Sequence, residues 1–269
     1  MTKQDAAAPI LTAKDHAAPS VFQPENLLRE ARRQLGLAPG GIPEVCLLDP
    51  DGDLVRALRA SGQATLSPHW ACYHTELWLF ERGAERMGVI GCAVGASFAV
   101  LVAEQLFASG CRLLISVTSA GQVSETGPPP YFVLIERALR DEGTSYHYLP
   151  PSDFSAAPAM LLDPVFAALR GTGLPIRRGA TWTTDAPFRE TETAIAAARA
   201  RGVLAVEMEA AALYAFATAR GRDVLCFAHV TNQMARIEGD FEKGEANGTR
   251  DMLLLVETSV TAWRTIRRV

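Results

Sequence analysis

Short apolar runs rich in β-branched residues alternate with longer helical stretches, and this alternation constrains the fold of the chain more than any other feature. Such a pattern is typical of α/β proteins, in which helices cover a sheet. It predicts a three-layer α/β fold with a twisted mixed sheet flanked by helices. The expected strands are 44–48, 73–81, 87–92, 112–117, 131–135, 176–183, 203–206 and 223–230. The expected helices are 54–60, 97–108, 159–170, 190–201, an alanine-rich stretch near 210–214, and 248–264.

The length and organisation of the chain predict one domain after a short tail. A length of 269 residues suits one large α/β domain or two small ones, and the sequence contains no internal repeat or low-complexity linker. Residues 1–20 are rich in Ala, Pro and small polar residues and lack the apolar core of a signal peptide. We therefore expect a disordered tail at 1–20 and a single α/β domain at 21–269.

Composition argues against several classes of partner. The net charge is −4, and Lys and Arg are scattered without a basic stripe, so we expect no binding to nucleic acid. The longest apolar run, 93–102, is interrupted by Gly95 and Ser97, so we expect no membrane span. The five cysteines form no CxxC pair, which predicts reduced thiols in a cytoplasmic protein and no zinc site. Nothing in the sequence implies a cofactor or a metal.

The stretch 202–214 is the most informative for function. It predicts a short apolar strand that runs directly into a helix, with Glu207 and Glu209 at the junction and Met208 between them. Ligands of α/β proteins bind where strands end, and a buried acid there is costly unless it is paired. Two acids suit the hydroxyl groups of a ribose, and the methionine suits its apolar face. Spacing alone also fits two acids that only complement the dipole at the start of the helix.

Other strand ends carry further polar and aromatic groups. Phe188 follows the strand at 176–183 and offers an exposed or buried aromatic ring there. Four polar side chains also lie at strand ends: Arg189, Glu190, Asn232 and Gln233. Composition alone also fits Phe188 as a core aromatic residue, and Asn232 and Gln233 as strand-end caps.

Five segments together resemble the nucleoside phosphorylase superfamily, which includes uridine phosphorylase, hexameric purine nucleoside phosphorylase and methylthioadenosine nucleosidase. The most specific is Val-Glu-Met-Glu-Ala at 206–210, and the others are 95–106, 118–122, 140–148 and 183–188. The resemblance runs from about residue 44 to the C-terminus. It implies a homo-oligomer, either a dimer or a hexamer, that binds a small nucleoside, with or without phosphate.

The resemblance also implies roles for individual residues. Met208 would pack on the sugar, Glu209 would hold a ribose hydroxyl, and Glu207 would lie at the edge of the base or the sugar. Phe188 would stack on the base, although Pro187 is an extra residue relative to the family. Three residues would border the ribose and the attacking group: Thr118, Ser119 and Gly121. Either Asn232 or Arg189 would take up charge on the departing base, and the expected catalytic residues are Glu209 and Asn232.

The chain departs from the family at the phosphate site. Relatives that use phosphate supply arginines, because the guanidinium fork matches phosphate oxygens. Three such positions hold Gly52, Ser116 and the segment 72–75, which reads Cys-Tyr-His-Thr. These departures predict that a standard phosphate site is absent.

The first loop adds three acids, Asp49, Asp51 and Asp53. Each would repel a phosphate dianion at close range by about 1 kcal/mol or more. One of them could instead position a water molecule, as a carboxylate does in the nucleosidase branch of the family. Turn chemistry alone also fits this loop as an Asx-type turn with a left-handed Gly52.

The sequence therefore predicts cleavage of the N-glycosidic bond of a nucleoside in the manner of uridine phosphorylase, with water or phosphate as the acceptor. Relatives that act on adenine use an aspartate where this chain has Asn232, and an amide cannot act as a general acid. An oxo-base such as uracil or hypoxanthine therefore fits better than adenine. The alternative is a nucleoside- or base-binding protein that has lost catalysis.

Overall fold

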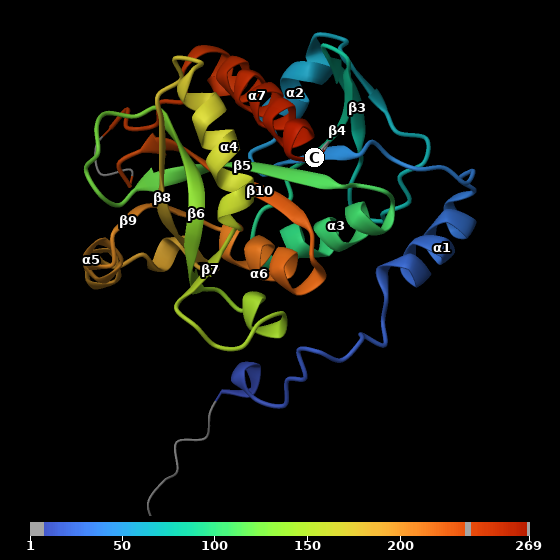
Figure 1. Cartoon of the computed structure of the whole chain (residues 1–269), viewed down its shortest axis with the longest axis horizontal. Helices are drawn as coiled ribbons and strands as arrows, with labels where there is room; N and C mark the ends of the chain where they lie inside the picture. The colour runs from blue at the N-terminus through green and yellow to red at the C-terminus, as the bar shows by residue number, and fades with distance from the viewer. Residues whose placement is uncertain (1–7, 235–237, 268–269) are drawn as a thin grey trace, which may run out of the picture.

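The computed structural model describes residues 8–234 and 238–267. The predicted α/β class is confirmed: the strands form one mixed sheet, and helices lie on both sides of it (Figure 1). The strands are β1 (Val45–Asp49), β2 (Ala64–Leu66), β3 (Trp78–Arg82), β4 (Glu85–Gly91), β5 (Leu113–Gln122), β6 (Tyr131–Asp141), β7 (Phe154–Ala156), β8 (Ile176–Thr184), β9 (Val203–Glu207) and β10 (Asp223–Asn232).

Seven α-helices occur within the described residues. They are α1 (Pro24–Leu35), α2 (Asp53–Ala60), α3 (Ala96–Ala108), α4 (Ala159–Arg170), α5 (Glu192–Ala200), α6 (Ala210–Arg220) and α7 (Thr249–Arg267). Four short 3₁₀ turns accompany them: η1 (Pro9–Leu11), η2 (Ser145–His147), η3 (Pro187–Arg189) and η4 (Glu245–Gly248).

Strand pairing brings the ends of distant segments together. The sheet runs in the order β10-β6-β8-β9-β5-β1-β4-β3-β2, and β10 also pairs with β5. The five strands β10, β6, β8, β9 and β5 therefore form a closed circuit of pairings. The parallel pairs β1–β5 and β5–β10 place their carboxyl ends at one edge. Strand β9, which is parallel to β8, runs antiparallel to β5 but pairs with it only through the carboxyl-terminal residues of both strands, so the ends of β8 and β9 meet that edge.

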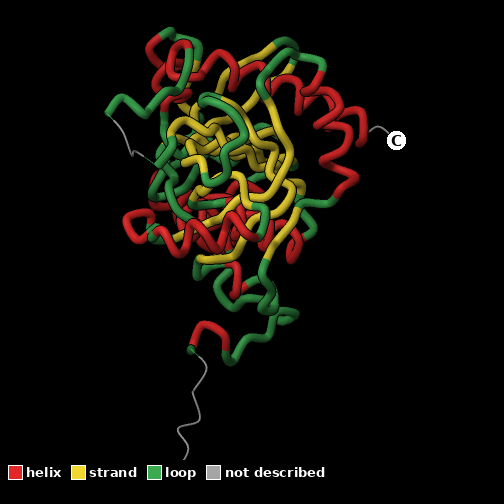
Figure 2. The backbone as a smooth tube through the Cα atoms, turned by 90° about the vertical axis from the view of Figure 1, so that its left-hand side faces the viewer, coloured by secondary structure: helices red, strands yellow, loops and turns green. Residues whose placement is uncertain are grey.

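Helices pack on the two sides of this sheet. In Figure 1, α2, α4 and α7 lie on one side of the strands, and α3 and α6 lie on the other. Figure 2 shows the same arrangement from the side, with strands at the centre and helices around them. Most of α6 is buried, including every residue from 210 to 216, because its alanines allow close packing on the sheet. Within α6, the Tyr214 hydroxyl donates to the Ile135 carbonyl at 2.6 Å.

The structure extends several elements beyond their predicted bounds. The helix at 159–170 has the predicted limits, whereas β5 continues beyond its predicted end at residue 117 to Gln122. The continuation is stabilised by pairing, since β5 bonds β10 along its length and then crosses to β9 at Gly121. The strand expected at 73–81 covers only Trp78–Arg82. Three elements had no sequence prediction: α1, β2 and β7.

The N-terminal segment before α1 lies along the outside of the body (Figure 2). Residues 1–7 of the expected tail lie outside the described residues. In the part that is described, Lys14 Nζ lies 3.1 Å from His147 Nδ1, and His16 Nε2 lies 3.1 Å from the Tyr146 carbonyl oxygen. These contacts hold residues 14–16 against η2.

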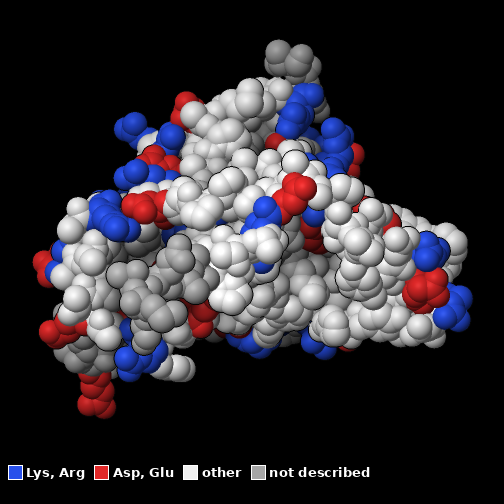
Figure 3. Space-filling view, turned by 90° about the horizontal axis from the view of Figure 1, so that it is seen from below, with Lys and Arg blue, Asp and Glu red and all other residues white. Residues whose placement is uncertain are grey.

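Helix hydropathy and surface charge bear on whether the protein binds membranes or charged partners. None of the helices in 8–234 and 238–267 has both the length and the hydropathy needed to cross a bilayer. On the face seen in Figure 3, acidic and basic groups are interspersed, and neither sign forms a continuous patch.

Candidate active site at the carboxyl edge of the sheet

The junction between β9 and α6 positions both predicted glutamates inside the protein. Val203–Glu207 forms β9, and α6 begins at Ala210, so Glu207 ends the strand and Glu209 is the N-cap of the helix. Both side chains are buried, with exposures of 3% and 1%. The two carboxyl groups nevertheless have very different surroundings.

Every oxygen of the Glu207 carboxylate is hydrogen-bonded within the chain. Thr181 and Thr183 of β8 donate their hydroxyls to Oε1, the former at 3.1 Å. The backbone N–H groups of Glu209 and Ala210 each donate to Oε2 at 2.7 Å. Burial raises the pKa of Glu207, and these hydrogen bonds act in the opposite direction. Glu207 therefore ties β8 to the start of α6, and its partners leave little capacity for a ligand.

Only one oxygen of the Glu209 carboxyl has a hydrogen-bond partner among the described residues. Oε1 accepts from the Gly95 N–H at 2.7 Å, at the start of α3, whereas Oε2 is buried and has no hydrogen-bond partner among the described residues. Burial and the charge of Glu207 raise the pKa of Glu209 to about 8, against the effect of the Gly95 N–H. Buried acceptors without partners are rare and costly, so this oxygen is suited to accept from a ligand.

The residues predicted to contact the faces of the sugar and the base are more open. Met208 is half-buried between the two glutamates. The Phe188 ring, on η3, is 99% exposed, and Arg189 beside it is also exposed. The core interpretation of Phe188 is therefore wrong. Glu190 is half-buried, and burial raises the pKa of its carboxyl to about 7.

Strands β5 and β10 bring two of the other predicted residues together. Asn232 pairs with Gly121 in the β10–β5 register, and Gly121 pairs with Val206 of β9. The Asn232 amide is buried; its Oδ1 accepts from the Met234 N–H at 2.9 Å, and its Nδ2 lies 3.2 Å from Thr231 Oγ1. A side chain at position 121 would lie 2.6 Å from Met234 Sδ, so glycine permits this close approach.

Thr118 and Ser119 have unequal environments on β5. Thr118 is buried, and its hydroxyl lies 3.4 Å from the Ser119 carbonyl oxygen. The Ser119 hydroxyl donates to Asp51 Oδ1 at 2.7 Å. A carboxylate of this chain is therefore bound at the part of β5 where the family resemblance placed the attacking group.

A lysine from a distant loop completes this cluster. Lys243 Nζ lies 3.2 Å from Asp51 Oδ2 and 2.6 Å from Asp53 Oδ2. Asp53 also bonds Arg56, at 2.6 Å. The third acid, Asp49, caps the start of α2 by accepting from the Gly52 and Val55 N–H groups, and burial raises its pKa to about 6. The Asx-type turn interpretation thus holds for Asp49, whereas Asp51 and Asp53 reach across the sheet edge to another loop.

Sequence reasoning missed Lys243, Gly95 and the two threonines of β8 as neighbours of the site. Lys243 lies in an irregular loop with no periodic pattern, and only the folded chain brings it to the first loop. Within the described residues, no group of three or more His, Cys, Asp or Glu side chains could hold a metal ion.

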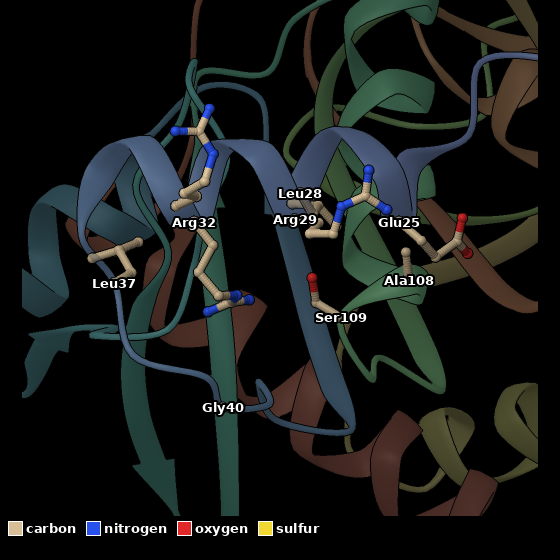
Figure 4. Close-up of a pocket in the computed structure, with 9 residues that line it drawn as sticks. Glu25, Leu28, Arg29, Arg32, Leu37, Gly40, Ala108 and Ser109 are labelled. Atoms are coloured by element: carbon tan, nitrogen blue, oxygen red, sulfur yellow. The ribbon is translucent and has the colours of Figure 1, made fainter.

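A surface pocket of about 500 Å³ lies elsewhere, between α1 and the end of α3 (Figure 4). Arg32 of α1 donates to the carbonyls of Ala38 and His69, both at 3.0 Å, and so fastens α1 to the body. None of the predicted site residues lines this pocket.

A profile of the phosphorylase superfamily matches residues 40–260, which is most of the chain. The chain belongs to the phosphorylase superfamily. The family resemblance drawn from the Glu-Met-Glu segment and the other motifs is therefore confirmed.

This superfamily member is similar to curated purine nucleoside phosphorylases. A DeoD-type purine nucleoside phosphorylase from Psychromonas ingrahamii is 26% identical over 180 residues, covering 66% of this chain and 76% of the relative. One from Bacillus cytotoxicus is 30% identical over 152 residues, covering 56% of this chain and 65% of the relative. The match thus spans less than two thirds of the Bacillus protein.

Solved structures share the fold. Uridine phosphorylase from Vibrio fischeri ES114, complexed with 6-hydroxy-1-naphthoic acid, matches with a TM-score of 0.66 and 18% identity. The match covers 85% of this superfamily member and 93% of that chain. At this identity, the likeness establishes the shared fold alone.

Proposed function

We propose that this protein cleaves the N-glycosidic bond of a nucleoside and transfers the sugar to water. The observation that carries the proposal is the buried, unpartnered Oε2 of Glu209, next to the half-buried Met208. A sugar hydroxyl can donate to this oxygen, and the methionine can pack on the ring. Similarity to nucleoside phosphorylases supports the same class of reaction.

The remaining residues have complementary roles in this proposal. Cleavage passes through a transition state in which the sugar carries positive charge. Glu209 binds the hydroxyls of that sugar, and Glu207 positions Glu209 by bonding its backbone N–H. The exposed Phe188 ring offers a face to the base, and Arg189 offers charge at its edge. The Asn232 amide donates to a base whose oxygen delocalises the departing charge, which favours an oxo-base.

The acceptor follows from the surroundings of Ser119. Its hydroxyl, together with Thr118, faces the attacking group in the family resemblance, and here it is bonded to Asp51. A carboxylate in this position disfavours a phosphate dianion and can accept a proton from a water molecule. Water is therefore the acceptor that the described residues favour.

A base-release assay tests the reaction and the acceptor together. We expect uridine or inosine to release free base and free ribose at the same rate with and without inorganic phosphate. Release that requires phosphate and yields ribose 1-phosphate would show phosphorolysis instead. If neither condition releases base while calorimetry detects nucleoside binding, the protein is a nucleoside-binding protein and the proposed reaction is wrong.

The pH dependence should report Glu209. Burial and the charge of Glu207 raise the pKa of this carboxyl to about 8, and the ionised form accepts more hydrogen bonds from the sugar. Because kcat/KM follows the ionisation of groups in the free enzyme, we expect it to rise with pH up to about 8. The Glu209→Gln variant should lack this rise. The same rise in the variant would assign it to another group.

A further inference from the structure

The ion pair between Asp51 and Lys243 joins two loops at the edge of the sheet. Asp51 lies just after β1, and Lys243 lies in the loop between β10 and α7, 192 residues further along the chain. Both side chains are largely shielded from solvent, with exposures of 24% for Asp51 and 27% for Lys243. Neither the family motifs nor the proposed reaction accounts for this pair.

Two hydrogen-bond donors converge on the Asp51 carboxylate from opposite sides. Ser119 Oγ donates to Oδ1 at 2.7 Å, and Lys243 Nζ lies 3.2 Å from Oδ2. A serine hydroxyl and an ammonium group are donors that also bind inorganic oxyanions. The carboxylate therefore occupies an anion position formed by Ser119 and Lys243.

We propose that Asp51 is the built-in occupant of this anion position and that it excludes phosphate from the protein. The inference deepens the proposed function, because it names the residue that selects water as the acceptor. A phosphate ion could reach Ser119 and Lys243 only by displacing Asp51 and lying beside an extra negative charge.

Neighbouring cations do not offset that cost. Arg56 is bonded to Asp53 and to the Asp51 carbonyl oxygen, at 2.6 and 2.8 Å. His229, on β10, is buried and stacked on Phe132, and burial lowers its pKa to about 4, so its ring is neutral at pH 7. Among the described residues, the cluster therefore contains three carboxyl groups (Asp49, Asp51 and Asp53) and two cations (Arg56 and Lys243).

The Lys243 backbone is held in place close to the site. A side chain at Gly248 would lie 2.4 Å from His229 Cε1 and 2.7 Å from the Lys243 carbonyl oxygen. The loop therefore folds back tightly on β10. Because Lys243 is tethered by this packing and by Asp53, it should stay near Ser119 when Asp51 is removed.

Calorimetric titration of the purified protein with inorganic phosphate, at constant ionic strength set with sodium chloride, tests the proposal. We expect no saturable binding to the wild type. The Asp51→Ala variant should bind phosphate saturably, at least about tenfold more tightly than the detection limit that the wild type sets. Asp51→Asn provides a second variant of nearly the same shape if Asp51→Ala does not fold, and it should show a smaller gain in the same direction.

Two matched variants separate an anion position from a general change of charge. Asp53→Ala removes the same charge from the same loop but leaves Asp51 on Ser119, so its gain should be much smaller. The double variant Asp51→Ala/Lys243→Ala should lose the gain. The proposal is overturned if neither Asp51 variant gains phosphate binding, if Asp53→Ala gains as much, or if the double variant binds as tightly as Asp51→Ala.

Base release with the same proteins keeps this result distinct from the proposed function. If the wild type hydrolyses nucleosides, Asp51→Ala should release base faster when phosphate is added. If no variant releases base, the proposed function fails, and the phosphate titration still decides whether Asp51 occupies an anion position.

Discussion

Replacing Glu209 with glutamine should lower kcat/KM for a ribonucleoside about a hundredfold or more. The glutamine keeps the shape and one acceptor oxygen but loses the charge that binds two sugar hydroxyls. A hydrogen bond to a charged group contributes about 1.5–3 kcal/mol, and each 1.36 kcal/mol corresponds to about a factor of ten in rate. Steady-state kinetics of base release would measure the loss.

A control must show that the effect belongs to this site. Glu104, on α3, is also a partly buried carboxylate, and it bonds the Tyr148 hydroxyl at 3.0 Å and Arg220 at 3.2 Å. Glu104→Gln should leave kcat/KM within about twofold of the wild type. Equal rates for Glu209→Gln and wild type would remove Glu209 from the proposed mechanism. The Glu209→Gln change should lower kcat/KM less for a 2′-deoxynucleoside, which lacks one hydroxyl, than for the ribonucleoside.

Replacing Glu207 with alanine should reduce the free energy of unfolding by about 3–5 kcal/mol, because the change leaves four buried donors without their acceptor. Two of these donors are threonine hydroxyls on β8, and two are N–H groups at the start of α6. Unfolding in guanidinium chloride, followed by circular dichroism, would measure the difference.

Glu207→Gln is the matched comparison. Its oxygen can accept from the two N–H groups, and its amide can donate to the threonine hydroxyls, which rotate to accept. We expect it to lose less than half as much stability as Glu207→Ala. A loss below about 1 kcal/mol for the alanine variant would mean that this network does not hold β8 to α6.

The sequence predicted the class of fold because its signals were local. Apolar runs and helical periodicity depend on neighbours within a few residues, so the helix at 159–170 has its predicted limits. Element ends depended on distant partners. Pairing with β10 and β9 carried β5 beyond its predicted end to Gln122. Helix α1 was missed although its signals are local, with Pro24 in its first turn and Gly36 at its C-cap.

The sequence likewise predicted one part of the candidate site, whereas the other part depended on the tertiary structure. The Glu-Met-Glu spacing placed two acids and a methionine at a strand–helix junction, and the structure has both acids buried there. Spacing could not distinguish their environments. Glu207 received two of its four internal hydrogen bonds because β8 lies beside β9. Glu209 points to Gly95 and retains an oxygen that has no partner among the described residues. Composition also could not show that the Phe188 side chain is exposed.

By itself, the sequence determined the α/β class, the superfamily and the position of the Glu-Met-Glu segment, because each is encoded in residues close together along the chain. Only the tertiary structure brings the Ser119 hydroxyl and the Lys243 ammonium group to the Asp51 carboxylate, since the three residues come from separate segments of the chain. Coulombic and hydrogen-bond energies depend on distance in space and on burial, and neither quantity can be read from separation along the chain.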